Sequence, residues 1–339
     1  MACLVGMVAL AGMLVLSLAA CGQPGEPMPG SVEPVSDPAS DSPFVVVLGI
    51  GQDAGVPQTG SYRHPGWQDA AQRQRVVSLG LVDPATGERW LFEATPDLPD
   101  QLYHLDSLAH AVGPDAATPL ARSGLSGVFV THAHIGHYTG LMYLGHEAMG
   151  AQAMPVYAMP RMAAFLTENG PWSQLVRYDN IALQVLADGE SVRLNERLAV
   201  TPFVVPHRQE FSEVVGYRIE GPSRSVLFIP DIDSWEDWDE ASGGGPRIEA
   251  EMARVDVAYL DATFYANGEI PGRDMSGFPH PFIVHSMDRF APLPDAERAK
   301  VRFIHLNHTN PALRPDSAAR DTIVARGLRV AETGEVVGL

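Results

Sequence analysis

Three histidines stand together directly after an apolar run, and this arrangement constrains the fold more than any other feature of the chain. The run covers residues 125–130, and His132, His134 and His137 follow it. Strand side chains alternate between two faces, so His132 and His134 point the same way and can bind one metal ion. The turn at Gly136 lets His137 reach a second position. The pattern predicts a metal site; the alternative is a solvated loop rich in histidine, which would leave costly polar groups near the core.

Three further apolar runs end in a residue type that binds metals. They precede His207, Asp231 and His305. Any one of these residues taken alone is more often a strand cap or a hydrogen-bonded surface group. Four strand ends of the same kind indicate one shared site.

Strands and helices alternate along residues 43–339, which predicts a single α/β domain with helices outside a sheet core. No internal repeat is visible in the residues. The main predicted elements are strands at 44–50, 125–130, 156–158, 198–205, 255–260 and 301–306, hairpins within 76–93 and 216–229, and helices at 97–111, 138–149 and 161–168.

The first residues predict export. Residues 1–20 are almost wholly apolar and end in Leu-Ala-Ala before Cys21, which is the pattern of a bacterial lipoprotein signal peptide. Cys21 would carry the lipid, and residues 21–42, rich in Pro, Gly and Ser, would form a disordered tether. The alternative is a transmembrane anchor of the same length. No Lys or Arg occurs before Arg63, so the usual basic segment is missing. Either anchor places the domain outside the cytoplasm and attached to the cell envelope, and Gly22 after the cysteine favours the outer membrane where a cell has one.

Composition narrows the chemistry. Cys3 and Cys21 are the only cysteines, so a metal in residues 43–339 must be held by histidine and carboxylate. The formal charge of −18 argues against a nucleic-acid substrate, for which a basic face is expected. A small-molecule substrate is expected instead, and the sequence leaves the oligomeric state open.

The order of these residues resembles the metallo-β-lactamase superfamily. The shared pattern is a His-x-His-x-x-His cluster, a lone His before a Gly-Tyr-Arg strand, an Asp and a late His. Residues 52–58 and 303–311 resemble the branch that contains the pyrroloquinoline quinone biosynthesis protein B. The resemblance implies an αββα sandwich with one or two Zn²⁺ ions at the edge where loops from both sheets meet.

The resemblance also implies roles for individual residues. The first metal would be bound by His132, His134 and His207, the second by His137 and His305, and Asp231 would bridge the two. Three neutral imidazoles leave the charge of a zinc ion intact, so a bound water reaches a pKa near ~7 and acts as hydroxide, which Asp231 would orient.

His280 is a candidate general acid, because relatives of the phosphodiesterase type keep a His in this region that protonates the leaving group. Histidine has the ordinary pKa that this task needs. The alternative is that His280 and His285, which lie beside Pro and Phe, pack as aromatic rings in a lid loop.

One position departs from the family pattern. Most members have Asp two residues after the second histidine, where this chain has Gly136. The second metal would then keep only His137, His305 and a share of Asp231, or be completed by Asp233, His308 or water. On this interpretation Gly136→Asp raises the zinc count. A two-His, one-carboxylate set is also the ligand set of ferrous oxygenases, so Fe²⁺ is an alternative metal.

The sequence therefore predicts a lipid-anchored, metal-dependent hydrolase that uses a metal-bound hydroxide to attack an ester, phosphodiester, lactone or amide. Two alternatives stay open. One is a non-haem iron oxygenase related to pyrroloquinoline quinone synthesis, and the other is a metal- or ligand-binding lipoprotein without catalytic activity.

Overall fold

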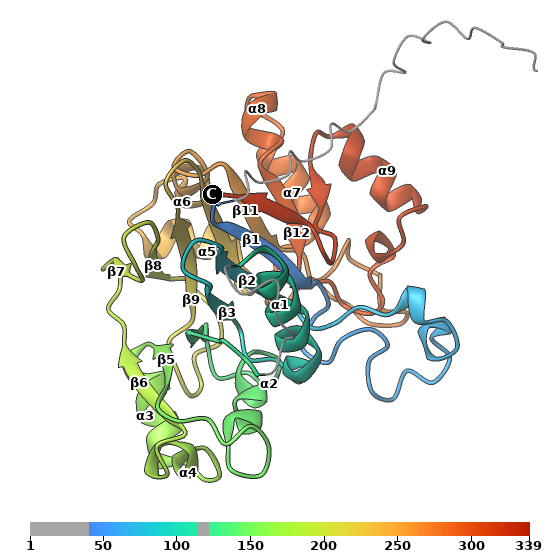
Figure 1. Cartoon of the computed structure of the whole chain (residues 1–339). Coiled ribbons are helices and arrows are strands. Elements are labelled where there is room, and N and C mark those ends of the chain that lie inside the picture. Colours follow the sequence, from blue (N-terminus) through green and yellow to red (C-terminus); the bar gives the residue numbers. More distant parts are fainter. Residues whose placement is uncertain (1–40, 114–121) are drawn as a thin grey trace, which may run out of the picture. The chain divides into compact units, whose positions relative to one another are not determined.

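The first sheet of the computed structural model has the strand order β14-β1-β2-β3-β4-β5-β6 (Figure 1). The pairs from β14 to β3 are antiparallel, and the pairs from β3 to β6 are parallel. Its strands are β1 (Phe44–Gly49), β2 (Ser78–Asp83), β3 (Glu88–Phe92), β4 (Gly127–Phe129), β5 (Met154–Ala158), β6 (Ile181–Val185) and β14 (Val336–Gly338).

The second sheet repeats this arrangement, with the strand order β7-β8-β9-β10-β11-β12-β13. Again the first three pairs are antiparallel and the last three are parallel. A repeat that the residues do not reveal is therefore present in the strand pairing. The strands are β7 (Val192–Arg193), β8 (Ala199–Val204), β9 (Val215–Glu220), β10 (Ser225–Ile229), β11 (Val257–Asp261), β12 (Val301–Ile304) and β13 (Arg329–Val330).

The structure describes residues 41–113 and 122–339. The predicted signal peptide 1–20, Cys21 and the tether up to residue 40 lie outside this part of the chain, so those predictions stay predictions. Within the described residues, no helix is both long enough and apolar enough to span a membrane.

The two sheets pack face to face through a core of aromatic and branched side chains. The ring of Tyr217, on β9, meets Phe92 and Phe129 of the first sheet edge-on, each at 5.5 Å between ring centroids. Strand β1 is apolar at every position because both of its faces are buried. Val45 and Val47 join this central core, whereas Val46 joins the core beneath the outer helices. A strand buried on both faces needs no polar alternation.

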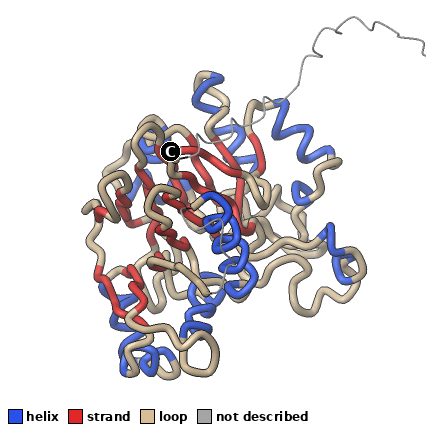
Figure 2. Tube along the Cα trace, viewed as in Figure 1, coloured by secondary structure: helices blue, strands red, loops and turns tan. Residues whose placement is uncertain are grey.

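Helices cover the outer face of each sheet, as the tube view shows (Figure 2). Leu105 of α1 and Met162 of α3 pack on the first sheet, whereas Trp235 of α5 and Phe290 of α7 pack on the second. The predicted α/β sandwich is therefore confirmed. The helices are α1 (Leu98–Val112), α2 (Ile135–Tyr138), α3 (Pro160–Glu168), α4 (Trp172–Arg177), α5 (Trp235–Ala241), α6 (Arg247–Met252), α7 (Ile283–Phe290), α8 (Asp295–Arg298) and α9 (Ala318–Ala325).

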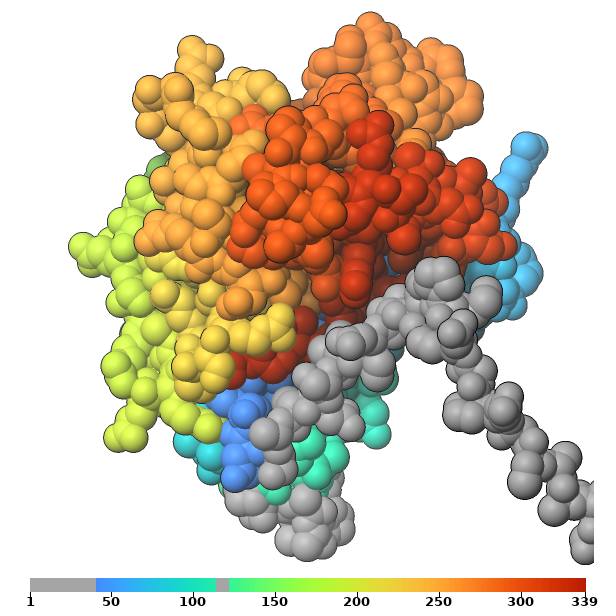
Figure 3. Space-filling model, turned by 90° about the horizontal axis from the view of Figure 1, so that it is seen from above, coloured from blue at the N-terminus to red at the C-terminus, as the bar shows by residue number. Residues whose placement is uncertain are grey.

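Elements late in the chain, coloured orange to red, lie together on the face seen in Figure 3. Short 3-10 turns complete the structure: η1 (Pro65–Trp67), η2 (Ala70–Gln72), η3 (Thr139–Leu144) and η4 (Pro311–Leu313).

The predicted helix at 138–149 is wrong. The chain forms α2 only as far as Tyr138 and then continues as the 3-10 turn η3. The amide of Gly140 donates to the carbonyl of Ala94 at 2.8 Å instead of continuing a helical ladder. This segment is therefore drawn toward the end of β3, which brings α2 close to the strand ends.

Candidate metal centre

The first group of candidate ligands comes from three strand ends. His132 and His134 follow β4, His207 follows β8 and Asp231 follows β10. The Oδ2 atom of Asp231 lies 3.3 Å from His132 Nε2 and 3.1 Å from His207 Nε2, and His132 Nε2 lies 2.9 Å from His134 Nδ1. Four ligand atoms on a tetrahedral zinc ion with ordinary bond lengths stand about 3.4 Å apart. The spacing of this group fits such an ion.

The second group surrounds His137, on α2, and His305, which follows β12. Together with Asp53 they place one ligand atom each within 4.8 Å of the others. Asp53 Oδ1 lies 3.2 Å from His137 Nε2 and 3.9 Å from His305 Nε2. Asp231 Oδ2 lies 3.7 Å from His137 Nε2, so this carboxylate faces both groups, as expected of a bridging ligand.

Several of these atoms are buried without a hydrogen-bond partner. They are His137 Nε2, His207 Nε2, His305 Nε2, Asp53 Oδ1 and Asp231 Oδ1. Each unsatisfied buried group costs about 1–3 kcal/mol, so such a concentration is exceptional. A divalent metal bound by these atoms would satisfy them, and the residues present therefore fit a divalent metal.

Partners on the other side of each imidazole fix its orientation. His207 Nδ1 contacts Asp233 at 2.8 Å, His305 Nδ1 contacts Thr263 at 2.9 Å, and His137 Nδ1 contacts the fully buried Glu93 at 3.1 Å. A carboxylate behind a histidine selects the tautomer that presents Nε2 to a metal. Glu93 also accepts a hydrogen bond from Thr131 Oγ1 at 2.6 Å, so it ties the histidine loop to the end of β3.

Backbone strain is present at the same place. His305 and Glu93 have φ angles of 62° and 80°, in the left-handed region that residues other than glycine rarely adopt. Such conformations cost about 1–3 kcal/mol each and persist where surrounding contacts enforce them, often at functional sites. Both residues lie in a segment that carries or supports a candidate ligand.

His280 lies beside the first group rather than in it. Its Nδ1 atom is 3.0 Å from Asp261 Oδ2 and 3.3 Å from Asp231 Oδ1. Burial lowers the pKa of His280, but these two carboxylates outweigh burial and raise that pKa to about 10. His285, by contrast, is exposed and stacks on Phe282 at 5.2 Å between ring centroids. Of the two histidines in this loop, only His280 faces the candidate ligands.

Asp231 and His132 of the first group have charges that suit a cation, whereas burial lowers the pKa of His207 but Asp231 and Asp233 outweigh it and raise that pKa to about 9. Burial raises the pKa of Asp231, but His207 and His280 outweigh burial and hold that pKa well below its usual range. Burial and the neighbouring His137 lower the pKa of His132 well below its ordinary value. An ionised carboxylate and a neutral imidazole are the forms that bind metals.

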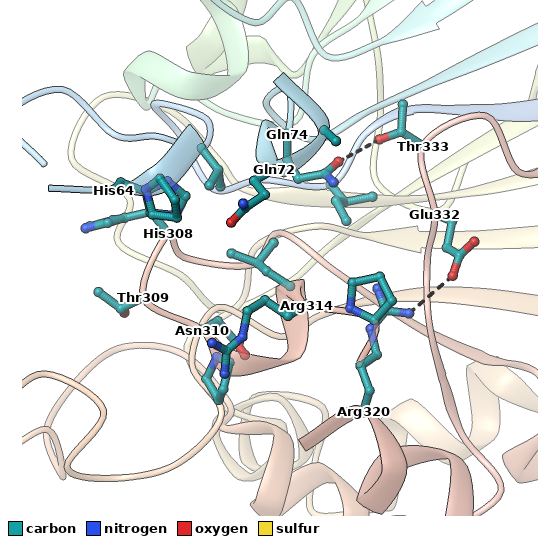
Figure 4. Close-up of a pocket in the computed structure, with 17 residues that line it drawn as sticks. His64, Gln72, Gln74, His308, Thr309, Asn310, Arg314, Arg320, Glu332 and Thr333 are labelled. Carbon is teal, nitrogen blue, oxygen red and sulfur yellow. Dashed lines mark hydrogen bonds and ion pairs between the residues drawn. The ribbon is translucent and has the colours of Figure 1, made fainter. Parts of the chain in front are cut away.

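The residues proposed to complete the second position do not lie there. Asp233 supports His207, and His308 lines a separate cavity of about 530 Å³, where it lies near His64, with Arg320 and Glu332 at the other end (Figure 4). None of the candidate metal ligands lines this cavity.

Sequence reasoning missed Asp53 and Glu93. Glu93 directly follows β3, so it has the same sequence pattern as the other candidates, an apolar run followed by a residue type that binds metals. Asp53 stands four positions beyond the end of β1, within a loop rich in Gly, and only the fold reveals where it points.

Known proteins share sequence similarity with most of this chain. Coenzyme PQQ synthesis protein B of a Methylorubrum extorquens strain is 26% identical over 318 residues, covering 87% of this chain and 99% of that protein. The same protein of Xanthomonas oryzae pv. oryzae is 26% identical over 321 residues, covering 87% and 99%.

Solved structures show the same fold. The Zn²⁺-bound PqqB from Methylobacterium extorquens has a TM-score of 0.69 at 23% identity, covering 87% of this chain and 100% of that one. A diphosphatase from the PhnP family has a TM-score of 0.59 at 19% identity, covering 88% and 97%.

A family model, the beta-lactamase superfamily domain, matches residues 88–306. The match includes all the candidate ligands except Asp53. Because it spans well over half of the 339 residues, the chain belongs to the beta-lactamase superfamily.

Proposed function

We propose that this chain is a metal-dependent hydrolase of a small-molecule ester, phosphodiester, lactone or amide, exported and lipid-anchored at Cys21. The observation that carries the hydrolase proposal is the convergence on Asp231 Oδ2 of three buried imidazole nitrogens, those of His132, His137 and His207, of which the last two have no hydrogen-bond partner. A divalent metal held there supplies a Lewis acid and a water whose pKa falls to about 7.

The surrounding residues supply the remaining parts of such a reaction. Asp231 faces the histidines of both groups and would orient a metal-bound water there. His280 is held through Nδ1 by the fully buried Asp261, which leaves the Nε2 nitrogen for proton transfer. This nitrogen can donate a proton to a leaving group. Asp261 also accepts from Thr263 Oγ1 at 2.7 Å, which keeps the carboxylate directed at His280.

Exposed apolar side chains stand next to the first group. Ile135, which follows His134, is 65% exposed. Phe211 is 60% exposed and follows Glu210, whose carboxylate lies 3.2 Å from His134 Nε2. Large apolar groups that remain in contact with water beside a polar site favour a substrate with an apolar part.

The test is hydrolysis by the purified, zinc-loaded chain of a panel of aryl and alkyl esters, a phosphodiester, a lactone and an amide. We expect turnover of at least one ester or lactone with an apolar group, loss of turnover after chelation, and recovery when zinc is returned. If the zinc-loaded chain hydrolyses no member of the panel, the proposed function is wrong.

A ferrous oxygenase is the second candidate, because Asp53, His137 and His305 form a two-His, one-carboxylate set. Metal analysis of protein purified without chelators separates the candidates. Zinc supports hydrolysis, whereas iron together with oxygen consumption supports the oxygenase.

We expect His280→Gln to lower kcat by about 10²–10⁴-fold for an alkyl ester or alkyl phosphodiester, because a poor leaving group needs the proton. For a p-nitrophenyl substrate, whose leaving group is stable as an anion, the loss should be much smaller. The control is His285→Gln, in the same segment but exposed. Equal losses on both substrates would contradict the role of His280 as a general acid.

A further inference from the structure

The loop after β1 places a carboxylate where the family motif leaves a gap. Asp53 Oδ1 lies 3.2 Å from His137 Nε2, and both atoms are buried without a hydrogen-bond partner. His305 Nε2, also unpartnered, lies 3.9 Å from the same oxygen. Three unsatisfied ligand atoms therefore lie within 4.8 Å of one another.

Gly136 and Asp53 compete for the same space. A Cβ atom added at Gly136 would overlap the Cα atom of Asp53 and lie 2.5 Å from its Oδ1. Gly136 lies within α2 and has an ordinary helical backbone, so it is needed for space rather than for conformational freedom. A side chain at 136 and this position of Asp53 exclude each other.

Hydrogen bonds to the segment after β12 hold this loop in place. The amide of Gln52 donates to the carbonyl of Leu306 at 2.9 Å, and the amide of Leu306 donates to the carbonyl of Ile50 at 2.8 Å. The side chain of Asn307 also donates to Gln52. These bonds join the residues before Asp53 to the residues after His305, so both candidate ligands rest on one hydrogen-bonded unit.

We propose that Asp53 is a ligand of the second metal, taking from the β1 loop the role that a carboxylate at position 136 has in the related motif. This inference rests on the proposed metal chemistry. The second metal is then held by Asp53, His137 and His305 with a share of Asp231, and its affinity depends on the loop after β1 rather than on α2. The glycine at 136 therefore does not mean that a metal ligand has been lost. Its missing side chain leaves the room that the Asp53 carboxylate occupies.

The experiment measures zinc binding to the full chain by titration against a competing chelator, with metal content counted after dialysis. The wild-type chain should bind two zinc ions. Asp53→Asn keeps the shape of the side chain and should weaken the second ion by on the order of 100-fold or more, since even partners behind the ligands cost 10–100-fold. The first ion should be unaffected. The matched control is Asp69→Asn, which changes an exposed carboxylate that follows the same loop and should still bind two.

The relocation itself is tested by exchanging the two positions. Asp53→Gly combined with Gly136→Asp returns the carboxylate to α2 and removes the contacts with the Asp53 side chain, but a Cβ atom at 136 still lies 2.3 Å from the Cα atom of residue 53, so the β1 loop must shift. In the folded double variant the second zinc should bind more tightly than in Asp53→Asn. Circular dichroism melting of each variant checks that the chain is folded.

The outcomes separate this inference from the proposed function. If Asp53→Asn binds two zinc ions as tightly as the wild type, Asp53 is not a ligand, and the hydrolase proposal is unaffected. If the wild type binds only one zinc ion, the second position is not a metal site. The inference about Asp53 is then overturned, whereas the hydrolase proposal stands. If the wild type binds none, both proposals are overturned.

Discussion

Gly136→Asp should destabilise the chain and lower its zinc content. Any Cβ atom at this position overlaps the backbone of Asp53, so α2 or the β1 loop must move. Overpacking of this kind costs about 1–3 kcal/mol. The new carboxylate would also stand beside an existing one, which adds repulsion. We expect a fall in Tm of roughly 5 °C and loss of the second zinc ion.

Measurement of Tm and zinc content will check this. Gly245→Asp is the control, because a Cβ atom there meets no other atom within 4 Å. This variant should melt and bind zinc as the wild type does. The sequence alone led to the opposite expectation, that Gly136→Asp adds zinc. A variant that is as stable as the wild type and binds more zinc would restore that earlier interpretation.

Asp231→Asn should nearly abolish hydrolysis. The buried carboxylate faces His132, His207 and His137 within 3.7 Å, and among the described residues it is the only one placed to offset the charges of both metals at once. The amide keeps the shape but loses the charge, so we expect at most one zinc ion per chain. Metal ions contribute several kcal/mol to transition-state stabilisation, so kcat/KM should fall by on the order of 10³-fold or more.

A second buried aspartate provides the control for this variant. Asp106 pairs with Arg89 at 2.8 Å and contacts none of the candidate ligands. Asp106→Asn should lower the free energy of unfolding but leave the zinc count and kcat/KM of the folded protein unchanged. If Asp231→Asn retains two zinc ions and wild-type kcat/KM, the proposed bridging role is wrong.

Much of the fold follows from local patterns. The run 44–50 has no polar residue, and the structure buries β1 between the other sheet and the outer helices. Short apolar runs that end in histidine or aspartate identify the strand ends at which the candidate ligands gather. Such patterns can be recognised in the sequence because the burial of a strand and the alternation of its side chains between two faces affect residues that are neighbours in the chain.

What could not be predicted depends on contacts between distant segments. The helix expected at 138–149 is replaced by the 3-10 turn η3, in which Gly140 bonds to Ala94, a partner that no local pattern identifies. Asp53 meets His137 only after β1 and β4 have joined the same sheet. His308 follows His305 by three positions, yet the chain turns after Leu306 and carries it into a different cavity.

The wide spacing of the candidate ligands, from position 53 to position 305, also bears on stability in solution. An unfolded chain keeps only the local cluster of His132, His134 and His137 together, so zinc should bind the native state much more tightly than the unfolded one. By linkage, its contribution to the free energy of unfolding rises with the logarithm of free zinc, to about 2.7 kcal/mol at one hundred times the Kd of a single site. On the proposed metal chemistry, we therefore expect the protein's free energy of unfolding to rise with the zinc supply of its surroundings and to fall when a strong chelator is added.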